Sequence, residues 1–237
     1  MAFKIAYCAG HYIGTAGKRL PKALDKNETR EWVLNDRVAD HFAKAAAEYE
    51  GVQLYRTDDQ TGKTFVDIPK RVKQANDWGA DLYLDIHHNA ADKVFTGGGV
   101  EAFCYPKSTT GKKYRDAIYT AVVAAGGLKG NRATPLQEKA FDSLALSKMP
   151  AVLIEYGYMD SKTDAPVILT DAYAKKVAYA TMEGIAKVAG LKKPAAAPET
   201  GDKLYRVQMG AFKEKASAEA LVSRLKMAGF EAIIKEG

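Results

Sequence analysis

Histidine and glutamate side chains follow three of the apolar stretches in this 237-residue sequence. His11 comes just after the first stretch, the pair His87 and His88 comes after another, and Glu155 ends a third. If these stretches form parallel strands, their carboxyl ends meet at one edge of a sheet, where α/β folds hold their sites. Histidine and carboxylate ligands that leave one position open are typical of catalytic zinc. The pattern is therefore compatible with a zinc site, and ordinary polar loop sequence is the alternative for the histidine pair, which is often no more than that.

Glu155 has two interpretations from chemistry alone. It follows four apolar residues, and burying a carboxylate is costly unless the carboxylate has a partner. That partner is either a cation in a salt bridge or a water molecule beside a metal, for which Glu155 would act as general base and then as proton donor. His41 differs from the other histidines because it lies within a predicted helix beside Phe42. We expect it at the edge of the core and not at a metal.

The elements that must position these residues follow from hydrophobic periodicity. Short apolar runs alternate with stretches in which apolar residues recur about every 3.6 positions. This alternation predicts an α/β domain with a mostly parallel, twisted sheet flanked by helices. Strands are expected at residues 3–8, 52–55, 82–86, 100–105 and 151–154, and helices at residues 30–48, 67–78, 114–125 and 172–188.

A segment rich in proline and alanine, residues 192–202, divides the chain. Proline removes a helix donor and stiffens such a segment, so we predict a linker here. The linker would join a domain of residues 1–191 to a segment of residues 203–237. That segment is expected to form a small β-α-β unit, with strands at 204–212 and 230–234 around a helix at 216–227.

Composition and charge exclude several classes of protein. Apolar residues make up 47% and charged residues 27% of the chain, as in ordinary globular proteins. No apolar run approaches the roughly 18 residues that a membrane helix needs, so no membrane partner is expected. The net charge of +6 is spread without a block of like charges, so no nucleic-acid partner is expected. Cys8 and Cys104 lie in apolar runs and are expected to be buried free thiols.

A series of motifs over about residues 3–190 resembles the zinc-dependent N-acetylmuramoyl-L-alanine amidases of the amidase type 3 family. The motifs occur in the order that this family shows, and the last of them matches best. They are Gly10-His11, Glu31 followed by Asn35, Arg56-Thr57-Asp58, Ile86-His87-His88-Asn89-Ala90, Gly99-Val100-Glu101, and the stretch from Met149 to Tyr158 that contains Glu155.

The resemblance implies a peptidoglycan hydrolase that cleaves the amide bond between N-acetylmuramic acid and L-alanine. In such an enzyme His11, Glu31 and His87 would hold Zn²⁺ and leave room for a water molecule. The zinc would lower the pKa of this water and polarise the scissile carbonyl. Glu155 would take the proton of the water and deliver it to the leaving amine.

The resemblance also bears on the other residues near the groove. Glu28 and Glu31 lie on nearly the same face of a helix, so chemistry alone leaves both open as ligands. The spacing to Asn35 favours Glu31. Asn89 and Arg132 are expected to grip the peptide or to stabilise the oxyanion.

Two residues depart from the family pattern. Tyr12 stands where glycine is usual after the first histidine, and Asp85 stands where serine is frequent. Neither is an expected ligand, and we expect Tyr12 to change substrate preference more than activity. The alternative functions are a zinc carboxypeptidase that trims stem peptides and a non-catalytic peptidoglycan-binding protein. The complete set of His11, Glu31, His87 and Glu155 favours the enzyme.

The C-terminal segment resembles the SPOR family, which binds peptidoglycan. The motifs are the Val-Gln-Met-Gly-Ala-Phe stretch of residues 207–212 and the Ala-Gly-Phe turn of residues 228–230. The segment has about half the length of a full SPOR module, so we expect either a homodimer that pairs two such segments or a segment that moves on its linker. The N-terminus does not read as a secretion signal. We therefore expect synthesis in the cytoplasm and action on the cell wall after release, as in a phage endolysin or a bacterial autolysin.

Overall fold

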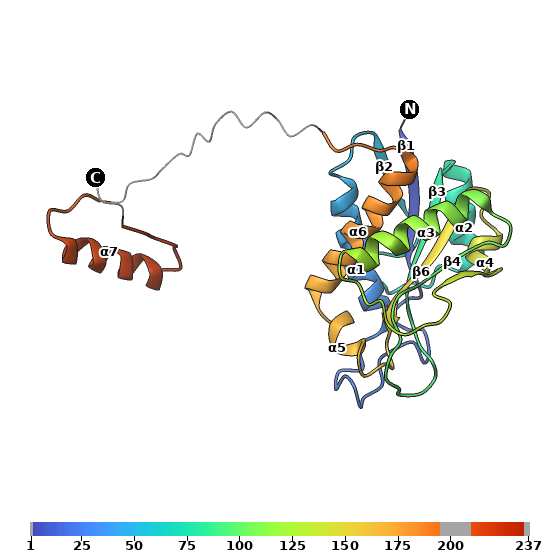
Figure 1. Ribbon diagram of the computed structural model, residues 1–237, viewed down its shortest axis with the longest axis horizontal. Helices are drawn as coiled ribbons and strands as arrows, with labels where there is room; N and C mark the ends of the chain where they lie inside the picture. Colours follow the sequence, from blue (N-terminus) through green and yellow to red (C-terminus); the bar gives the residue numbers. More distant parts are fainter. Residues whose placement is uncertain (1, 195–209, 235–237) are drawn as a thin grey trace. The chain divides into compact units, whose positions relative to one another are not determined.

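The computed structural model describes residues 2–194 and 210–234 (Figure 1). The chain divides into two compact units, Met1–Pro194 and Ala195–Gly237. This division falls inside the predicted linker, and each unit is described by itself below.

The first unit is built on one six-stranded sheet with the strand order β2-β1-β3-β6-β4-β5. Parallel pairing joins β1 to β2 and β3, and β3 to β6, so the carboxyl ends of these four strands meet at one edge. β4 runs antiparallel to β6 and starts at that same edge, and β5 is parallel to β4. The predicted mostly parallel sheet is confirmed. The strands are β1 (Phe3–Ala9), β2 (Val52–Arg56), β3 (Leu82–Asn89), β4 (Glu101–Cys104), β5 (Leu136–Glu138) and β6 (Ala151–Tyr158).

Helices cover both faces of the sheet. Successive side chains of β1 pack alternately against the helices on one face and on the other. Ile5 and Tyr7 belong to the core that contains residues of α1, α3 and α6, whereas Ala6 and Cys8 belong to the core on the α2 and α4 side. Successive strand residues point to opposite faces, so a buried strand must be apolar on both. The helices are α1 (Glu31–Ala46), α2 (Ile68–Trp78), α3 (Thr109–Ala124), α4 (Asp142–Ala145), α5 (Ala165–Ile168) and α6 (Asp171–Ala189).

Two strands extend further than their apolar runs predict. β3 continues to Asn89 and β6 to Tyr158, and these two residues pair across the strands. The polar residues His87, His88 and Glu155 therefore lie within strands and not in loops after them. A polar residue at the end of an apolar run usually marks a turn, but here the backbone ladder between the two strands continues past these residues.

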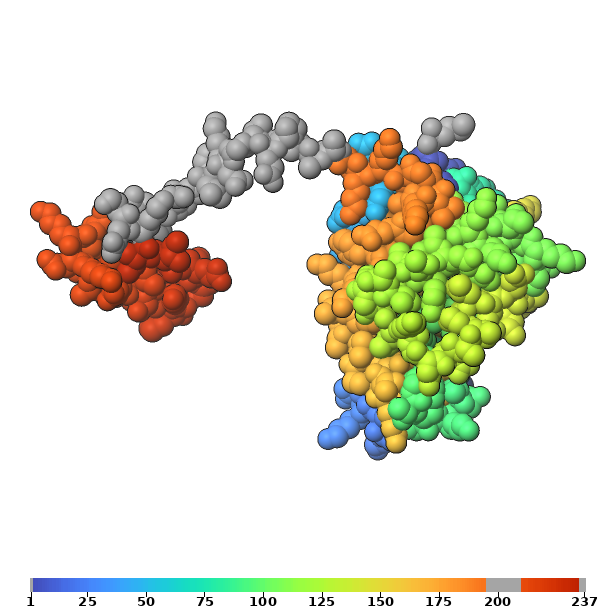
Figure 2. Space-filling model, in the orientation of Figure 1, coloured from blue at the N-terminus to red at the C-terminus, as the bar shows by residue number. Residues whose placement is uncertain are grey.

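The loops that follow the strands gather at the edge where β1, β2, β3 and β6 end. In the space-filling view, the segment after β1 (blue) and the segment after β3 (green) lie at the same, lower end of the first unit (Figure 2). α1 begins at this end too, because Glu31, its first residue, joins the same group of side chains. The fold thus brings three separate parts of the sequence to one edge.

Several smaller predictions are settled by the structure. Cys8 and Cys104 are free and buried, as expected. Nε2 of His41 donates a hydrogen bond to the Asp171 carboxylate, 2.9 Å away, and His41 lies outside the group of expected ligands. Among the described residues, no helix is both long enough and apolar enough to cross a membrane.

In the second unit the predicted helix is confirmed as α7 (Lys215–Met227). The strand expected at residues 230–234 does not form. A strand needs a hydrogen-bonded neighbour, and no described residue of this unit supplies one. Most of the other predicted strand, residues 204–212, lies outside the described residues.

Candidate metal centre and active site

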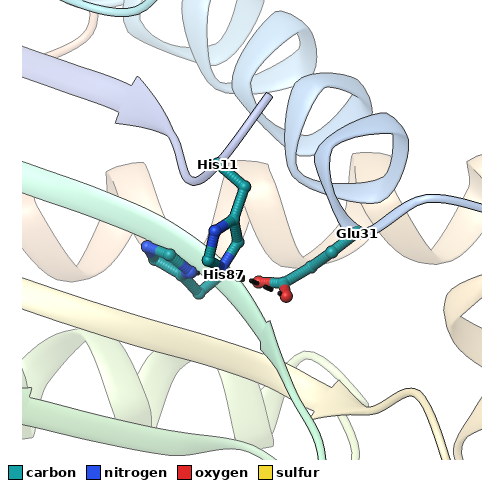
Figure 3. A group of neighbouring side chains, drawn as sticks. All are labelled: His11, Glu31 and His87. Atoms are coloured by element: carbon teal, nitrogen blue, oxygen red, sulfur yellow. Dashed lines mark hydrogen bonds and ion pairs between the residues drawn. The ribbon is translucent and has the colours of Figure 1, made fainter. Parts of the chain in front are cut away.

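Three side chains from different elements point toward one another at the edge of the sheet (Figure 3). His11 follows β1, Glu31 opens α1, and His87 lies in β3. Each offers one ligand atom, and these atoms all lie within 4.8 Å of one another. The expected ligand set is therefore brought together. Glu28, the alternative, pairs with Arg19 at 3.3 Å and is not part of this group.

The backbone before the first ligand allows this approach. A Cβ atom on Gly10 would lie 2.1 Å from the ring of His87, so only glycine fits there. His11 itself has a φ of +66°, which a residue other than glycine rarely adopts. The buried guanidinium of Arg71 donates to the carbonyl of His11 at 2.6 Å and to that of Ala9 at 2.9 Å. Arg71 thus holds the turn that presents His11.

The geometry of the three ligands fits a cation. Glu31 is only 1% exposed. Its Oε1 atom lies 3.0 Å from Nδ1 of His87, and its Oε2 atom lies 3.3 Å from Nε2 of His11. Burial opposes the charge on Glu31, but the two neighbouring imidazoles favour the carboxylate and lower the pKa of the carboxyl. Oε2 makes no hydrogen bond in the structure, although it is buried. A buried carboxylate whose two oxygens each face an imidazole nitrogen, one of them without a hydrogen bond, offers the oxygen and nitrogen ligands that a metal ion requires.

Asn35 and His88 support the ligands from behind. The Asn35 amide donates to the carbonyl of Gly10 at 3.1 Å, and its Oδ1 atom lies 2.8 Å from Nδ1 of His88. The backbone N–H of His88 donates to Oε1 of Glu31 at 3.3 Å. Burial lowers the pKa of His88 to about 3, so this imidazole stays neutral. His88 is a structural neighbour of the centre and not a ligand.

Asp85 orients the ligand His87, a role that sequence reasoning missed. Its Oδ1 atom lies 3.1 Å from Nε2 of His87 and accepts a hydrogen bond from the thiol of Cys8 at 3.0 Å. Burial opposes its charge, but the attraction of His87 lowers the pKa of Asp85 to about 2. Because Nε2 faces Asp85, the other ring nitrogen, Nδ1, faces Glu31. A carboxylate behind a metal-binding histidine fixes the ring and raises its basicity.

Glu155 lies beside this centre, in cross-strand register with His87. Its Oε2 atom is buried and makes no hydrogen bond. Burial raises the pKa of Glu155 to about 8, and Glu31 adds to the effect while His87 opposes it. A metal ion at the three ligands would lower this pKa again, since a nearby positive charge favours the carboxylate. A carboxyl group poised in this way can both accept and release a proton near neutral pH.

The two predicted substrate-binding residues meet at a second buried carboxylate, Glu101. Asn89 donates to Glu101 Oε2 at 2.9 Å, and Nε of Arg132 lies 3.7 Å from Oε1. Gln137 donates to Oε1 at 2.9 Å, and the hydroxyl of Tyr158 donates to Oε2. Arg132 also lies over the ring of Tyr158 at 5.2 Å. In the sequence Glu101 stands out only as part of a motif. Its role as the centre of this cluster could not be predicted, because its partners come from four separate segments of the chain.

A model of the N-acetylmuramoyl-L-alanine amidase family matches residues 5–187. The sporulation-specific N-acetylmuramoyl-L-alanine amidase of Bacillus subtilis (strain 168) is 35% identical over 195 residues, which is 79% of this chain and 68% of that protein. The N-acetylmuramoyl-L-alanine amidase CwlM of Bacillus licheniformis is 34% identical over 193 residues, which is 79% of this chain and 68% of that protein. An N-acetylmuramoyl-L-alanine amidase structure from Clostridium difficile 630 has the same fold, with a TM-score of 0.71, 24% identity, and 80% of this chain and 97% of that chain covered.

A SPOR domain model matches residues 174–236. This match confirms the resemblance of the C-terminal segment and starts earlier than the predicted residues 203–237. Its first part falls in α6, which packs on α1 and α3 in the first unit. The amidase match, in contrast, spans every element that supplies a residue to the centre. The chain therefore belongs to the N-acetylmuramoyl-L-alanine amidase family and is a peptidoglycan-hydrolysing enzyme of that family.

Proposed function

We propose that hydrolysis takes place at the centre formed by His11, Glu31 and His87, that the metal held there is zinc, and that Glu155 moves the proton. The observation that carries this proposal is the part-buried Glu155 carboxyl, whose buried Oε2 atom has no hydrogen-bond partner and which lies in register with the ligand His87. Two histidines and one glutamate are the ligand set of several zinc hydrolases. When bound, zinc activates water and polarises the scissile carbonyl.

The residues of the chain then perform a balanced hydrolysis. The attacking water gives a proton to the Glu155 carboxylate as its oxygen forms a bond to the carbonyl carbon of the lactyl group. The bond from this carbon to the L-alanine nitrogen breaks, and Glu155 delivers the proton to that nitrogen. The products are a carboxylic acid on the muramic acid side and a free amine on the peptide, and at neutral pH the acid gives up its remaining water proton to the amine or to solvent.

Arg132 and Asn89 would bind the peptide on the side of Glu101. The Arg132 side chain is 41% exposed, and its guanidinium can pair with a carboxylate of the substrate. Asn89 is held by Glu101 next to the strand that carries Glu155. Both residues would orient the peptide so that its amine lies within reach of Glu155.

Mass spectrometry of digested peptidoglycan tests the bond that is cleaved. The proposal predicts intact stem peptides with a free L-alanine amine, and glycan strands that carry free lactyl carboxylates. Release of single amino acids from the carboxyl end of the stem peptide would instead show a carboxypeptidase. Undigested glycan-peptide that still binds the protein would show a non-catalytic binding protein.

The second unit is proposed to bind peptidoglycan and to pair with a second copy. Support comes from the SPOR match and from exposed apolar side chains around α7, such as Met227 (87% exposed), Phe230 (64%) and Ile233 (88%). Light scattering of the full chain tests the pairing: a dimer is expected, and a monomer at all concentrations would contradict it. Action on the wall after release from the cytoplasm is likewise a proposal, which fractionation of producing cells tests.

A further inference from the structure

Two aromatic side chains lie next to the metal centre without a role in it. Tyr12 directly follows the ligand His11, and its ring lies 5.4 Å from that of Phe65, at an angle of 51°. Phe65 is 60% exposed, and the neighbouring Ile13 is 44% exposed. The sequence departs here from the glycine that is usual after the first histidine. Tyr12 is part-buried, so Phe65 supplies most of the exposed surface of the pair. An aromatic surface beside a catalytic centre offers an apolar contact to part of the substrate.

The backbone beneath this pair is firmly held. The N–H of Ile13 donates to the carbonyl of Gly62 at 3.0 Å, which ties the turn after β1 to the loop after β2. Within that loop, the Asp59 carboxylate accepts hydrogen bonds from the N–H groups of Thr61 at 3.0 Å and Thr64 at 2.7 Å. The two rings are therefore presented by ordered loops, and little freedom would be lost when a ligand packs on them.

The strand order places the aromatic pair on one side of the centre. Tyr12 follows β1 and Phe65 follows β2, at one end of the order β2-β1-β3-β6-β4-β5. Glu155 lies on β6, beyond the ligands of β1 and β3. Arg132 lies further on, beside Glu101 of β4. Along the edge of the sheet the order is thus aromatic pair, metal ligands, proton donor and guanidinium.

This order sets the direction of the substrate, if the proposed reaction is the one catalysed. The leaving nitrogen belongs to the peptide and must lie within reach of Glu155, so the peptide extends over β6 toward Arg132. The acyl group, which carries the lactyl ether and the sugar, then extends the other way, over β1 and β2. A pyranose ring has apolar C–H faces that gain free energy when they cover an aromatic surface. The peptide, in contrast, carries carboxylates that suit a guanidinium.

We propose that Tyr12 and Phe65 form the glycan-side subsite of this enzyme, on which an N-acetylated sugar ring of the substrate packs. The inference rests on the proposed function, because the bond cleaved defines the two sides. It assigns a binding role to two residues that hold neither the metal nor the proton.

Two soluble substrates with the same stem peptide test the subsite. One carries N-acetylmuramic acid, and the other carries only an N-lactoyl group, so it keeps the scissile amide but lacks the sugar ring. Phe65→Ala and Tyr12→Gly are expected to lower kcat/KM for the sugar substrate about tenfold, mainly through KM. Activity on the lactoyl substrate is expected to stay within twofold of the wild type. Phe65→Leu keeps apolar bulk without a flat ring, so its kcat/KM for the sugar substrate should lie between those of the wild type and of Phe65→Ala.

Phe141→Ala is the matched control. Phe141 is 41% exposed and pairs with Phe103 at 5.3 Å, but it follows β5, at the far end of the strand order from β2. Phe141→Ala should leave kcat/KM for both substrates unchanged. Metal content and thermal unfolding of each variant report separately on folding, and Phe65 is exposed enough that its replacement should not unfold the chain.

The outcomes are distinct. A loss confined to the sugar substrate supports the subsite. An equal loss on both substrates, or no loss on either, overturns it while the wild-type enzyme still cleaves the amide. Failure of the wild type to cleave the amide of either substrate contradicts the proposed function, and with it the subsite.

Discussion

Two glutamates lie opposite each other on neighbouring strands, Glu101 buried and Glu155 part-buried, and they differ in how fully their carboxylate oxygens are hydrogen-bonded. Glu101 of β4 and Glu155 of β6 are register partners. Glu101 accepts hydrogen bonds from Asn89, Gln137 and Tyr158. Glu155 has a buried oxygen without any hydrogen bond. Buried polar groups are nearly always hydrogen-bonded. At this centre the Oε2 atoms of Glu31 and Glu155 are not, which suits a ligand and a proton carrier, whereas the hydrogen-bonded Glu101 belongs to the scaffold.

The largest effect that tests this contrast is expected at Glu155. Glu155→Gln keeps the shape of the side chain but cannot accept a proton, so turnover should fall by about 10²- to 10⁴-fold. Bound metal should be retained, and stability should stay the same or rise, because a carboxyl with an unpartnered buried oxygen is removed. Steady-state kinetics with metal analysis measures this. A drop of less than about tenfold with metal retained would make Glu155 structural only.

The next largest effect is expected at Asp85, which sits behind a ligand. Asp85→Asn removes the charge that faces Nε2 of His87, so metal affinity should fall by about 10- to 100-fold. Competition with a chromophoric chelator measures the affinity without reference to activity. Asp85→Ser introduces the residue that is frequent in the family and should behave similarly. Unchanged affinity in both variants would remove Asp85 from the metal centre.

Glu101→Gln makes the same replacement as Glu155→Gln, but at the glutamate whose oxygens are all hydrogen-bonded. Each carboxylate oxygen of Glu101 accepts from at least one N–H or O–H donor, so an amide NH₂ at either position faces donors. Stability should fall by about 1–3 kcal/mol. Bound metal should be unchanged. Urea unfolding measures the cost, and a variant as stable as the wild type would show that the cluster around Glu101 is not as well satisfied as its geometry indicates.

The smallest effect is a pH dependence of stability that arises from His88. Its pKa is about 3 in the folded chain and about 6.5 in an unfolded chain, so the unfolded state binds the proton first as the pH falls. Stability from this group is therefore present at pH 7 and is lost as the pH falls below about 6.5. Between pH 7 and pH 5 the loss amounts to about 2 kcal/mol. In His88→Gln, urea unfolding in the presence of a chelator should show a correspondingly smaller loss, and an equal loss would assign it to other groups.

Sequence patterns predicted the elements that are long and periodic, and the residues that lie at their ends. The apolar runs of β1 and β3 pointed to His11 and to the pair His87 and His88, whereas Glu31, and His87 as the ligand of the pair, came from the resemblance to the amidase family. The short elements β5, α4 and α5 were missed, because three or four residues carry no measurable period.

Pairing between distant segments could not be predicted from local pattern. The approach of Asp85 to His87 depends on two rotamers in one strand, and the cluster at Glu101 depends on the antiparallel register of β4 and β6. The strand predicted at residues 230–234 failed for the same reason, since an apolar run becomes a strand only beside a partner.

Metal stoichiometry tests the central claim most directly. The wild-type chain and His87→Ala are loaded with zinc, freed of excess metal and analysed for bound zinc and for cleavage of the amide. His41→Ala serves as control, because His41 pairs with Asp171 away from the centre. We predict one zinc ion per chain with full activity in the wild type and the control, and neither zinc nor activity in His87→Ala. One zinc ion per chain with normal turnover in His87→Ala would contradict the account.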